Sequence, residues 1–347
     1  MIYKMDKMNY IAELESVLKE KMKYSTLNKI IEYYAQYFDD HMELGEKEET
    51  ICEELGPVEN LASSLIEGMN LKEVELFNSE ENVRMIDASL FDIRIHLVFG
   101  EQKNTCITYQ SREGFDEGLL SVVYRSNHLR ILQQKPRFTN GKPYLLVQLP
   151  KGYKGKLIIK TVDSRIIVDG NYIPTKINYN LTSRHGKIEL NDVICKKIEI
   201  QSQDGRIKLM RTTANQIELD NKNGSIDVLK CRSPYLVGKS MSGRINVNHS
   251  YSEYTELESL DGRVYVEDCM IDDCHIQSEH GKIFYGMDEI NEGLHLDLLS
   301  RQGKVIINGE KLQKNIQIVK DIKSRKKEKR YFNVYARSST GRIEVLH

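Results

Sequence analysis

Ser202-Gln-Asp-Gly205-Arg-Ile-Lys-Leu209 is one copy of a motif that recurs through the second half of this chain. Consecutive copies lie 19 residues apart (205 − 186 = 19, 281 − 262 = 19), and the other regular ones carry Gly186, Gly224, Gly243, Gly262 and Gly281. Looser copies follow at Gly303 and Gly341, and an eroded copy upstream has Ser164 in the glycine position. A fixed period of about 20 to 50 residues is typical of units that bury a core only by stacking on one another.

The residues around each glycine indicate which positions face inward. Two and four places after the glycine the chain carries almost only Ile, Leu and Val, whereas the place between them is mostly polar. This alternation indicates a strand with one buried face. Five places before the glycine the residue is again apolar in most copies. The copies therefore predict a parallel β-solenoid of about nine coils, right-handed by the usual rule for parallel crossovers.

Each coil is expected to turn at its Ser-x-x-Gly segment. A serine on the inner side of the corner can hydrogen-bond its neighbours above and below. The glycine is expected to supply the positive φ of a tight bend. Cys231 and Cys269 lie two coils apart, roughly 10 Å at the usual strand spacing, so we expect buried thiols rather than a disulfide.

Two segments precede the first repeat, Leu129-Arg-Ile-Leu132 and Leu145-Leu-Val-Gln-Leu-Pro150. Together with the repeats they give residues 83–347 a pattern that resembles a bacterial β-strand-repeat family of unknown function, whose members are labelled as candidate adhesins. The resemblance implies a solenoid fold. Because the label came from fold analogy, it implies little about activity.

The first 70 residues have a helical pattern instead. One apolar stripe follows the i, i+3, i+4, i+7 rule of a half-buried helix and comprises Leu27, Ile30, Ile31, Tyr34, Tyr37, Phe38 and Met42. A shorter helix is expected before this one and two after it, with Gly56 and Pro57 at the break between the last two. About four helices in some 65 residues make a marginal core.

Within this region, the segments 31–40 and 53–62 resemble the HAAS domain, an α-helical signalling module associated with PadR-type helix-turn-helix regulators. The resemblance implies a protein contact with a winged-helix regulator and no catalytic residue. We therefore expect an α+β chain with a helical domain at 1–70, a β-rich lead-in at 71–160 that caps the solenoid, and solenoid repeats at 161–347 with a basic insertion at 320–330.

The bulk composition excludes several classes of protein. Lys+Arg (50) nearly balance Asp+Glu (51), so no global field favours nucleic acid or membrane. The sequence has neither an apolar run long enough to span a bilayer nor a secretion signal. The six cysteines form no metal-binding pairs. These observations predict a cytoplasmic protein with reduced thiols.

A row of basic residues directly follows the glycines and could contact a polyanion. Its members include Arg206, Arg244, Arg263 and Lys282. Acidic residues occupy positions six and one before the glycine, and rows of opposite sign favour mutual pairing. The insertion 320–330, with Arg325, Lys326 and Lys327, could bind an acidic partner or could shield the edge of the last coil, which we favour.

Tyr265, Phe284 and Ile306 are expected to project outward at consecutive coils, where other copies are polar. Three neighbouring apolar side chains would form a contact patch, covered by the helical domain, a second copy or another partner. Tyr33 is a further partner-binding candidate if it lies off the buried stripe of its helix.

The pattern contains no nucleophile, phosphate-loop or metalloprotease motif, and its outer carboxylates are not clustered. We therefore predict a non-enzymatic cytosolic signalling or scaffold protein without cofactor or metal. Its helical domain would bind a PadR-type regulator, and its solenoid would give a rigid binding or self-association surface. The alternatives are an adhesin-like carbohydrate-binding protein and a polysaccharide-active β-helix enzyme.

Overall fold

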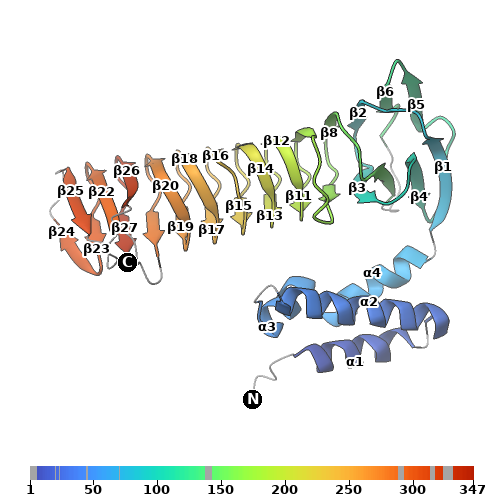
Figure 1. The fold of residues 1–347 in the computed structure, drawn as a ribbon, viewed down its shortest axis with the longest axis horizontal. Helices are drawn as coiled ribbons and strands as arrows, with labels where there is room; N and C mark the ends of the chain where they lie inside the picture. The colour runs from blue at the N-terminus through green and yellow to red at the C-terminus, as the bar shows by residue number, and fades with distance from the viewer. Residues whose placement is uncertain are drawn as a thin grey trace. The chain divides into compact units, whose positions relative to one another are not determined.

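The computed structural model describes residues 6–19, 21–22, 24–43, 46–69, 71–136, 143–287, 293–312, 317–322 and 331–347. The chain divides into two compact units. The first comprises Met1–Lys72 with Arg112–Gly114, and the second comprises Glu73–Ser111 with Phe115–His347. The first unit is helical and the second is built from strands (Figure 1).

Four helices make up the first unit, as the apolar spacing predicts: α1 Lys7–Leu18, α2 Tyr24–Glu43, α3 Glu48–Leu55 and α4 Val58–Met69. Asp6 caps α1 by accepting a hydrogen bond from the Asn9 amide at 2.8 Å. Gly56 ends α3 with a φ of 76°. The helices close on a small core that includes Tyr10, Leu14 and Phe38. In the described part of the chain, no helix has the length and hydropathy to cross a bilayer.

The second unit consists of two large sheets. Sheet A has 14 strands in the spatial order β1 Lys72–Ser79, β4 Thr105–Ser111, β7 Tyr144–Pro150, β3 Arg94–Gly100, β9 Ile166–Asp169, β11 Ile188–Asn191, β13 Ile207–Met210, β15 Ile226–Leu229, β17 Ile245–Asn248, β19 Val264–Glu267, β21 Ile283–Gly286, β27 Ile343–Leu346, β23 Val305–Ile307 and β24 Glu310–Leu312.

Sheet B has 13 strands in the order β25 Ile318–Ile322, β22 Gly293–Ser300, β26 Tyr331–Ser338, β20 Met270–Ser278, β18 Tyr251–Ser259, β16 Tyr235–Ser240, β14 Thr213–Asn221, β12 Ile194–Ser202, β10 Asn178–Ser183, β8 Lys156–Thr161, β2 Met85–Leu90, β6 His128–Gln133 and β5 Leu120–Arg125.

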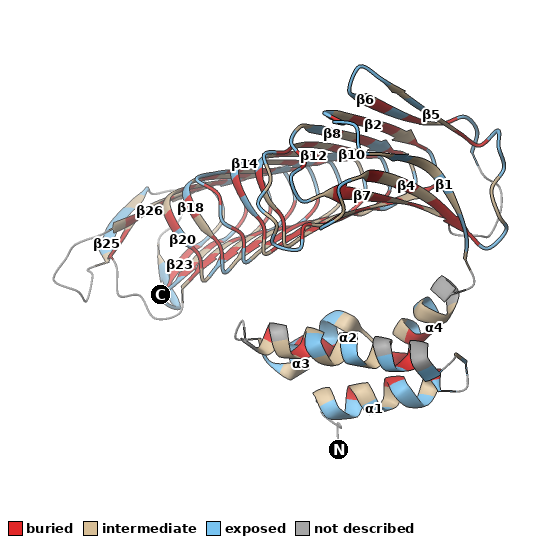
Figure 2. Ribbon diagram, turned by 45° about the vertical axis from the view of Figure 1, so that its right-hand side comes forward, coloured by how far each residue is buried: buried red, intermediate tan, exposed pale blue. Residues whose placement is uncertain are grey.

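Each repeat is one coil of a β-solenoid, as the motif predicts. The chain runs through sheet B, turns at Ser-x-x-Gly, continues through sheet A and returns to sheet B at a second corner (Figure 1). Neighbouring coils pair in parallel, so that Ile207 lies opposite both Ile188 and Ile226. The inward residues of both sheets are buried and form one continuous core (Figure 2).

Serine hydroxyls form hydrogen bonds at the first corner in several coils, but the bonds differ from the expected contacts above and below: Ser202 donates to its own Gly205 carbonyl, and the Ser259 hydroxyl has no partner among the described residues. In the coil of Gly281, the Ser278 hydroxyl accepts a hydrogen bond from the Gly281 amide at 3.0 Å and donates to the Gly262 carbonyl of the preceding coil at 3.3 Å. Asn221 replaces serine in one coil, where its side-chain oxygen accepts from the Gly224 amide at 3.0 Å. The corner serines and Asn221 are all buried.

The reason for the corner glycine differs from the expectation. Among the described glycines, only Gly56, Gly114 and Gly309 have a positive φ, and none of these is a corner glycine. A Cβ at Gly243 would instead overlap the carbonyl oxygen of Gly224 in the preceding coil, and the same overlap recurs along the stack. Glycine is therefore required because adjacent coils approach too closely for a side chain.

Positive φ values occur at the second corner, six places after the glycine. This row adopts the left-handed conformation without glycine, at Asp192 (54°), Arg211 (49°), Lys230 (52°), His249 (48°) and Asp268 (49°). A left-handed non-glycine residue has a conformational cost. The neighbouring coils offset this cost by satisfying the corner amides, as when Lys230 donates to the Asn248 carbonyl at 3.0 Å.

The coils at the C-terminal end do not stack in sequence order. We expected the coil of Gly303 to follow that of Gly281, with Gly341 last. In the structure, β26 lies between β20 and β22, and β27 lies between β21 and β23. The last coil of the chain is therefore inserted between two earlier ones. The two coils share the same corner geometry, because Gly341 stacks on Gly281 and Gly303 stacks on Gly341.

Antiparallel strands cover both ends of the stack. At the C-terminal end β24 pairs with β23 and β25 pairs with β22, while at the other end β4 pairs with β7 and β5 pairs with β6. The basic insertion begins inside β25, whereas residues 323–330 lie outside the described residues. The final strand β27 is flanked on both sides by its own chain.

The cysteines of the solenoid are free thiols, as expected for Cys231 and Cys269. Both are buried, and burial raises the pKa of each to about 12. Neither is therefore ionised near neutral pH.

Replacing Gly243 by alanine tests the corner constraint. The added Cβ would meet the Gly224 carbonyl, so we expect Gly243→Ala to lower the free energy of unfolding by about 2 kcal/mol. Urea unfolding followed by circular dichroism measures the change. Gly152→Ala is the matched control, because nothing lies within 4 Å of its Cβ. An equal effect of both substitutions would contradict the close-approach explanation.

Candidate functional site

The basic row after the glycines pairs with acidic residues of sheet A. The Arg206 guanidinium lies 2.7 Å from Asp227, whose other oxygen is 3.4 Å from Arg244. Lys282 lies 2.7 Å from Glu344. We expected the basic row to pair with the acidic residues that stand six or one place before the glycine. The observed acids stand three places after it, because that position shares the outer face of sheet A with the basic row.

The three-residue apolar patch does not form. Tyr265 lies opposite Phe284, with ring centroids 5.9 Å apart, but Phe284 lies opposite Glu344 rather than Ile306. The inserted strand β27 separates β21 from β23, and Ile306 is buried where β24 pairs with β23. Lys282 lies over both remaining rings, 6.0 Å from the Tyr265 centroid and 5.1 Å from that of Phe284.

The other predicted contact residues lie apart from these. Tyr33 has 63% of its surface exposed and its ring packs edge-on against Tyr34 at 5.2 Å. It therefore lies off the buried stripe of α2. Arg263 is exposed at its corner. Arg325, Lys326 and Lys327 lie outside the described residues.

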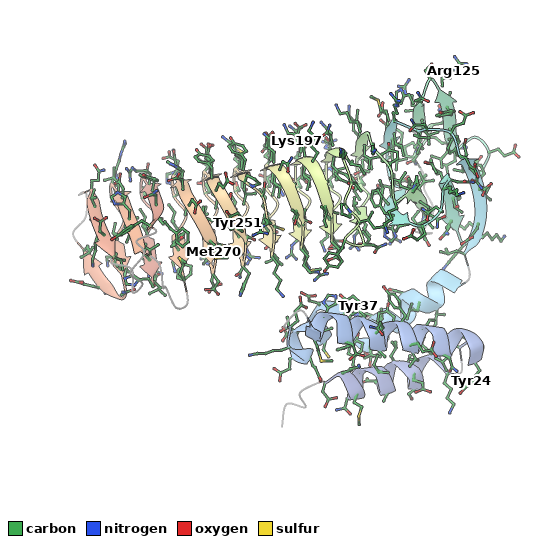
Figure 3. All side chains as sticks on the ribbon, viewed as in Figure 1. Tyr24, Tyr37, Arg125, Lys197, Tyr251 and Met270 are labelled. Carbon is green, nitrogen blue, oxygen red and sulfur yellow. The ribbon has the colours of Figure 1, made fainter. Side chains whose placement is uncertain are left out.

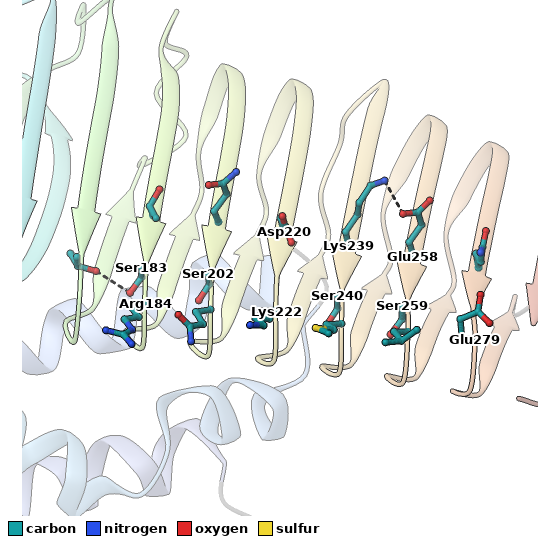
Figure 4. Close-up of a pocket in the computed structure, with 17 residues that line it drawn as sticks. Ser183, Arg184, Ser202, Asp220, Lys222, Lys239, Ser240, Glu258, Ser259 and Glu279 are labelled. Carbon is teal, nitrogen blue, oxygen red and sulfur yellow. Dashed lines mark hydrogen bonds and ion pairs between the residues drawn. The ribbon is translucent and has the colours of Figure 1, made fainter. Parts of the chain in front are cut away.

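A large hollow lies elsewhere, along the outer side of sheet B. It is an open groove with a volume of about 860 Å³ that follows the Ser-x-x-Gly corners across seven strands, from β8 to β20 (Figure 4). The corner serines lie beneath it. Because neighbouring strands lie about 4.8 Å apart, six spacings make the groove roughly 29 Å long.

Two rows of side chains line this groove. The strand row stands four places before the glycine and comprises Thr182, Gln201, Asp220, Lys239, Glu258 and Gln277. The corner row stands two places before the glycine and comprises Arg184, Gln203, Lys222, Met241, Leu260 and Glu279. Both rows follow from the repeat, since each coil contributes one residue to each row.

The charges of the strand row are partly neutralised within the sheet. Lys239 lies 2.8 Å from Glu258 and 3.4 Å from Glu256. Its hydrogen bond holds the pKa of Glu258 below the usual value. A general acid requires a raised pKa instead, so this carboxylate is suited to ion pairing rather than to proton donation.

The charge and polarity of the corner row change along its length. It is basic at Arg184 and Lys222, apolar at Met241 and Leu260, and acidic at Glu279. Met241 and Leu260 have 47% and 39% of their surfaces exposed. The corner row therefore has a positive end, an apolar middle and a negative end.

Two smaller hollows of about 340 Å³ and 450 Å³ lie beside the groove on the same sheet. The smaller of the two borders the groove at Lys239, and the other borders it at Glu258. Lys197, labelled in Figure 3, projects from the outer side of β12 and lies 2.6 Å from Glu199. The outer face of sheet B is thus hollowed over most of the regular coils.

Stacked rings cross this face at its C-terminal part. This aromatic ladder consists of Tyr235, Tyr254, His275, Tyr335 and His295. The first two rings are 5.5 Å apart and 8° from parallel, and His275 and Tyr335 are 4.5 Å apart and 13° from parallel. The rings cover one another's faces, so few ring faces are open to a ligand.

One group of side chains in the helical unit has a metal-like composition. His41, Glu46 and Glu54 each offer a ligand atom, and these atoms lie within 4.8 Å of one another. The His41 Nδ1 already lies 2.9 Å from a Glu46 oxygen, and both side chains are buried. This pair holds the end of α2 to the segment before α3, which explains the group without a metal.

Sequence reasoning missed the groove and the aromatic ladder. Both were visible in the aligned repeats as columns two, four, six and eight places before the glycine. We read the inward columns, the basic row, its acidic neighbours and one apolar outward patch, but not the outward columns as the lining of a hollow, because polar outward columns carry no burial signal. Which columns border a hollow depends on how the backbone bends at the corner, which the sequence pattern does not specify.

Two family models match the chain. The family described as Toastrack DUF4097 matches residues 71–234 and again residues 191–344. HAAS matches residues 9–64, where the sequence pattern indicated the same domain. A search of curated proteins finds no match.

Solved structures with a similar course of the chain are described as candidate binding proteins. A candidate lipid-binding protein from Parabacteroides distasonis is 15% identical, with 80% of this chain and 97% of that chain covered and a TM-score of 0.48. A candidate adhesin from Bacteroides fragilis is 14% identical, covering 79% and 97%, with a TM-score of 0.39. A candidate cell adhesion protein from Clostridium sporogenes is 10% identical, covering 80% and 98%, with a TM-score of 0.31. At these values none of them informs the function of this chain.

Neutralising Asp227 tests whether pairing limits polyanion binding by the basic row. In Asp227→Asn the guanidinium groups of Arg206 and Arg244 lose a shared counter-charge. We expect the variant to elute from heparin at a higher salt concentration than the native chain. Glu253→Gln changes the net charge equally at an exposed site and is the control. Equal shifts for both variants would show that only net charge matters.

Asp297→Asn tests the ion pair that joins the inserted strand β26 to β22. Arg337 lies 2.7 Å from Asp297 and lowers the pKa of this carboxyl. A carboxyl with a lowered folded-state pKa stabilises the fold above its ordinary pKa of about 3.9, and this contribution is lost as the pH falls through the lowered value. Urea midpoints should therefore be lower for Asp297→Asn at pH 7, with the gap narrowing as the pH falls below the ordinary pKa of the carboxyl. Asp87→Asn is the control, and a gap that persists in acid would contradict the assignment.

Proposed function

Because the chain belongs to the Toastrack DUF4097 family and carries a HAAS domain ahead of that region, we propose that it is a non-enzymatic cytosolic scaffold for protein interaction. The helical unit would bind a regulator, and the solenoid would present a rigid second surface. The observation that carries this proposal is the pairing, in one chain, of a HAAS domain with a long solenoid whose outer face is an open groove.

The composition of the groove supports binding rather than catalysis. Its acidic side chains are spread along the coils, and Glu258 is bound by Lys239 with a lowered pKa. Hydrolysis by a β-helix enzyme would need a pair of carboxyls, one of them with a raised pKa. The neutral and charged groups that alternate along the groove are suited to contacts with an extended ligand.

The exposed surface of α2 supports a partner for the helical unit. Tyr33 has 63% of its surface exposed, and large exposed aromatic side chains are enriched where proteins meet. We propose a PadR-type winged-helix regulator as the partner, because HAAS domains are associated with such regulators. Self-association through the solenoid ends is a second contact of the same class, since β24 and β25 are edge strands.

Affinity capture from native cytosol tests the regulator contact. The full chain should retain a winged-helix regulator identified by mass spectrometry, and Tyr33→Ala should reduce its recovery at least five-fold because an aromatic anchor is lost. Tyr24→Ala is the matched control, since Tyr24 lies on the same helix with 73% of its surface exposed. If Tyr33→Ala leaves the recovery unchanged, the regulator contact does not depend on Tyr33. If no sample retains a regulator, the proposed function is contradicted.

A further inference from the structure

We infer that the groove along the sheet B corners binds one extended peptide segment, acidic at one end, apolar in the middle and basic at the other. This inference rests on the proposed function, since it names the partner class of the solenoid surface. It follows from the order of the corner row, from Arg184 and Lys222 through Met241 and Leu260 to Glu279.

The groove has the shape of a linear site. It is straight, because every coil adds the same two positions, and it is open along its length (Figure 4). Arg184 and Glu279 belong to coils five spacings apart, or about 24 Å, which an extended peptide spans in about seven residues. A helix would need about sixteen residues for the same span.

Recognition must come from side chains rather than from strand addition. The amides at the corners already donate to the neighbouring coil, as when Met241 donates to the Lys222 carbonyl at 3.1 Å and Asp261 donates to the Met241 carbonyl at 2.8 Å. An occupant therefore finds no open ladder of backbone donors. Side-chain amides are available instead, because the structure records no partner for those of Gln201, Gln203 and Gln277 among the described residues.

The charges select the class of occupant. The groove carries three cations and three carboxylates (Arg184, Lys222 and Lys239 against Asp220, Glu258 and Glu279), so it is neutral as a whole. Lys239 and Glu258 neutralise each other, which leaves Arg184 and Lys222 with Asp220 at one end, a net positive charge, and the Glu279 carboxylate at the other. A polymer of uniform charge would be attracted at one end and repelled at the other.

A peptide can match this order, since its charged and apolar residues occupy defined positions. Met241 and Leu260 are exposed side by side in adjacent coils, and they would cover one or two apolar side chains of the occupant. A uniform neutral glycan would leave the end charges without partners. The aromatic ladder offers such a glycan little, because its rings cover one another's faces.

Three labelled synthetic peptides of eleven residues test this inference on the full chain by fluorescence anisotropy. One has two aspartates, two leucines and two lysines in that order, separated by serines. The second replaces the lysines by aspartates, and the third replaces the aspartates by lysines. We expect the first to bind at least ten-fold more tightly than the other two, because only it matches both ends.

Reversing the charges of groove residues should change which of the three peptides binds most tightly. With Arg184→Glu and Lys222→Glu both ends are acidic, so the lysine-only peptide should become the tightest ligand by at least ten-fold. Glu279→Lys is the converse variant, for which the aspartate-only peptide should bind best. Both sets of changes are at the surface, and thermal unfolding checks that the fold is kept. Lys208→Glu with Lys304→Glu is the matched control, since neither residue lines the groove or the two smaller hollows beside it.

Equal affinity for the three peptides would overturn the inference. So would the same change of preferred peptide in the control variant. If a neutral linear glucan hexasaccharide binds more tightly than any peptide, the peptide inference is wrong and the ligand of the groove is a glycan. Regulator capture by the helical unit is measured separately. A groove without peptide preference in a chain that still retains the regulator would therefore refute this inference alone.

Discussion

The close approach of stacked corners is the constraint on which the rest of the solenoid depends. Each Ser-x-x-Gly corner places its glycine against the carbonyl of the glycine in the preceding coil, where no Cβ fits. In the coil of Gly281 the serine joins two coils by accepting from its own glycine amide and donating to the neighbour's carbonyl. A coil can adopt this corner only in register with the next one, so the corner fixes the register of neighbouring coils along the stack.

A fixed register determines what the surface can do. Because residues 19 apart lie directly above one another, every outward position becomes a row, and each row contacts its neighbours at the strand spacing. Charged rows on the same sheet face pair and are neutralised, as Arg206 and Arg244 are by Asp227. Rows that border the corner line the groove instead. Function on this fold therefore depends on the order of residue types along a row rather than on a compact cluster.

The two ends of the stack meet a different requirement. A parallel solenoid leaves unpaired strand edges that can recruit other chains. Here the chain doubles back at the C-terminal end, inserts its last coil between β20–β21 and β22–β23, and covers the outer coil with two short antiparallel strands. The terminal strand is thereby held on both sides. The lead-in region closes the other end with β4 and β5.

The sequence alone determined the solenoid, its inward columns, its nine corner copies and the helical domain, because burial imposes a period that can be read residue by residue. It also placed serine and glycine at the corner, although it misassigned the role of the glycine. Only the tertiary structure decided the rest. The order of the last two coils, the partners of the basic row and the position of Ile306 depend on contacts between coils, which identical motifs do not distinguish. The groove likewise arises from how the backbone bends between two polar rows, and polar rows leave no periodic signal of burial.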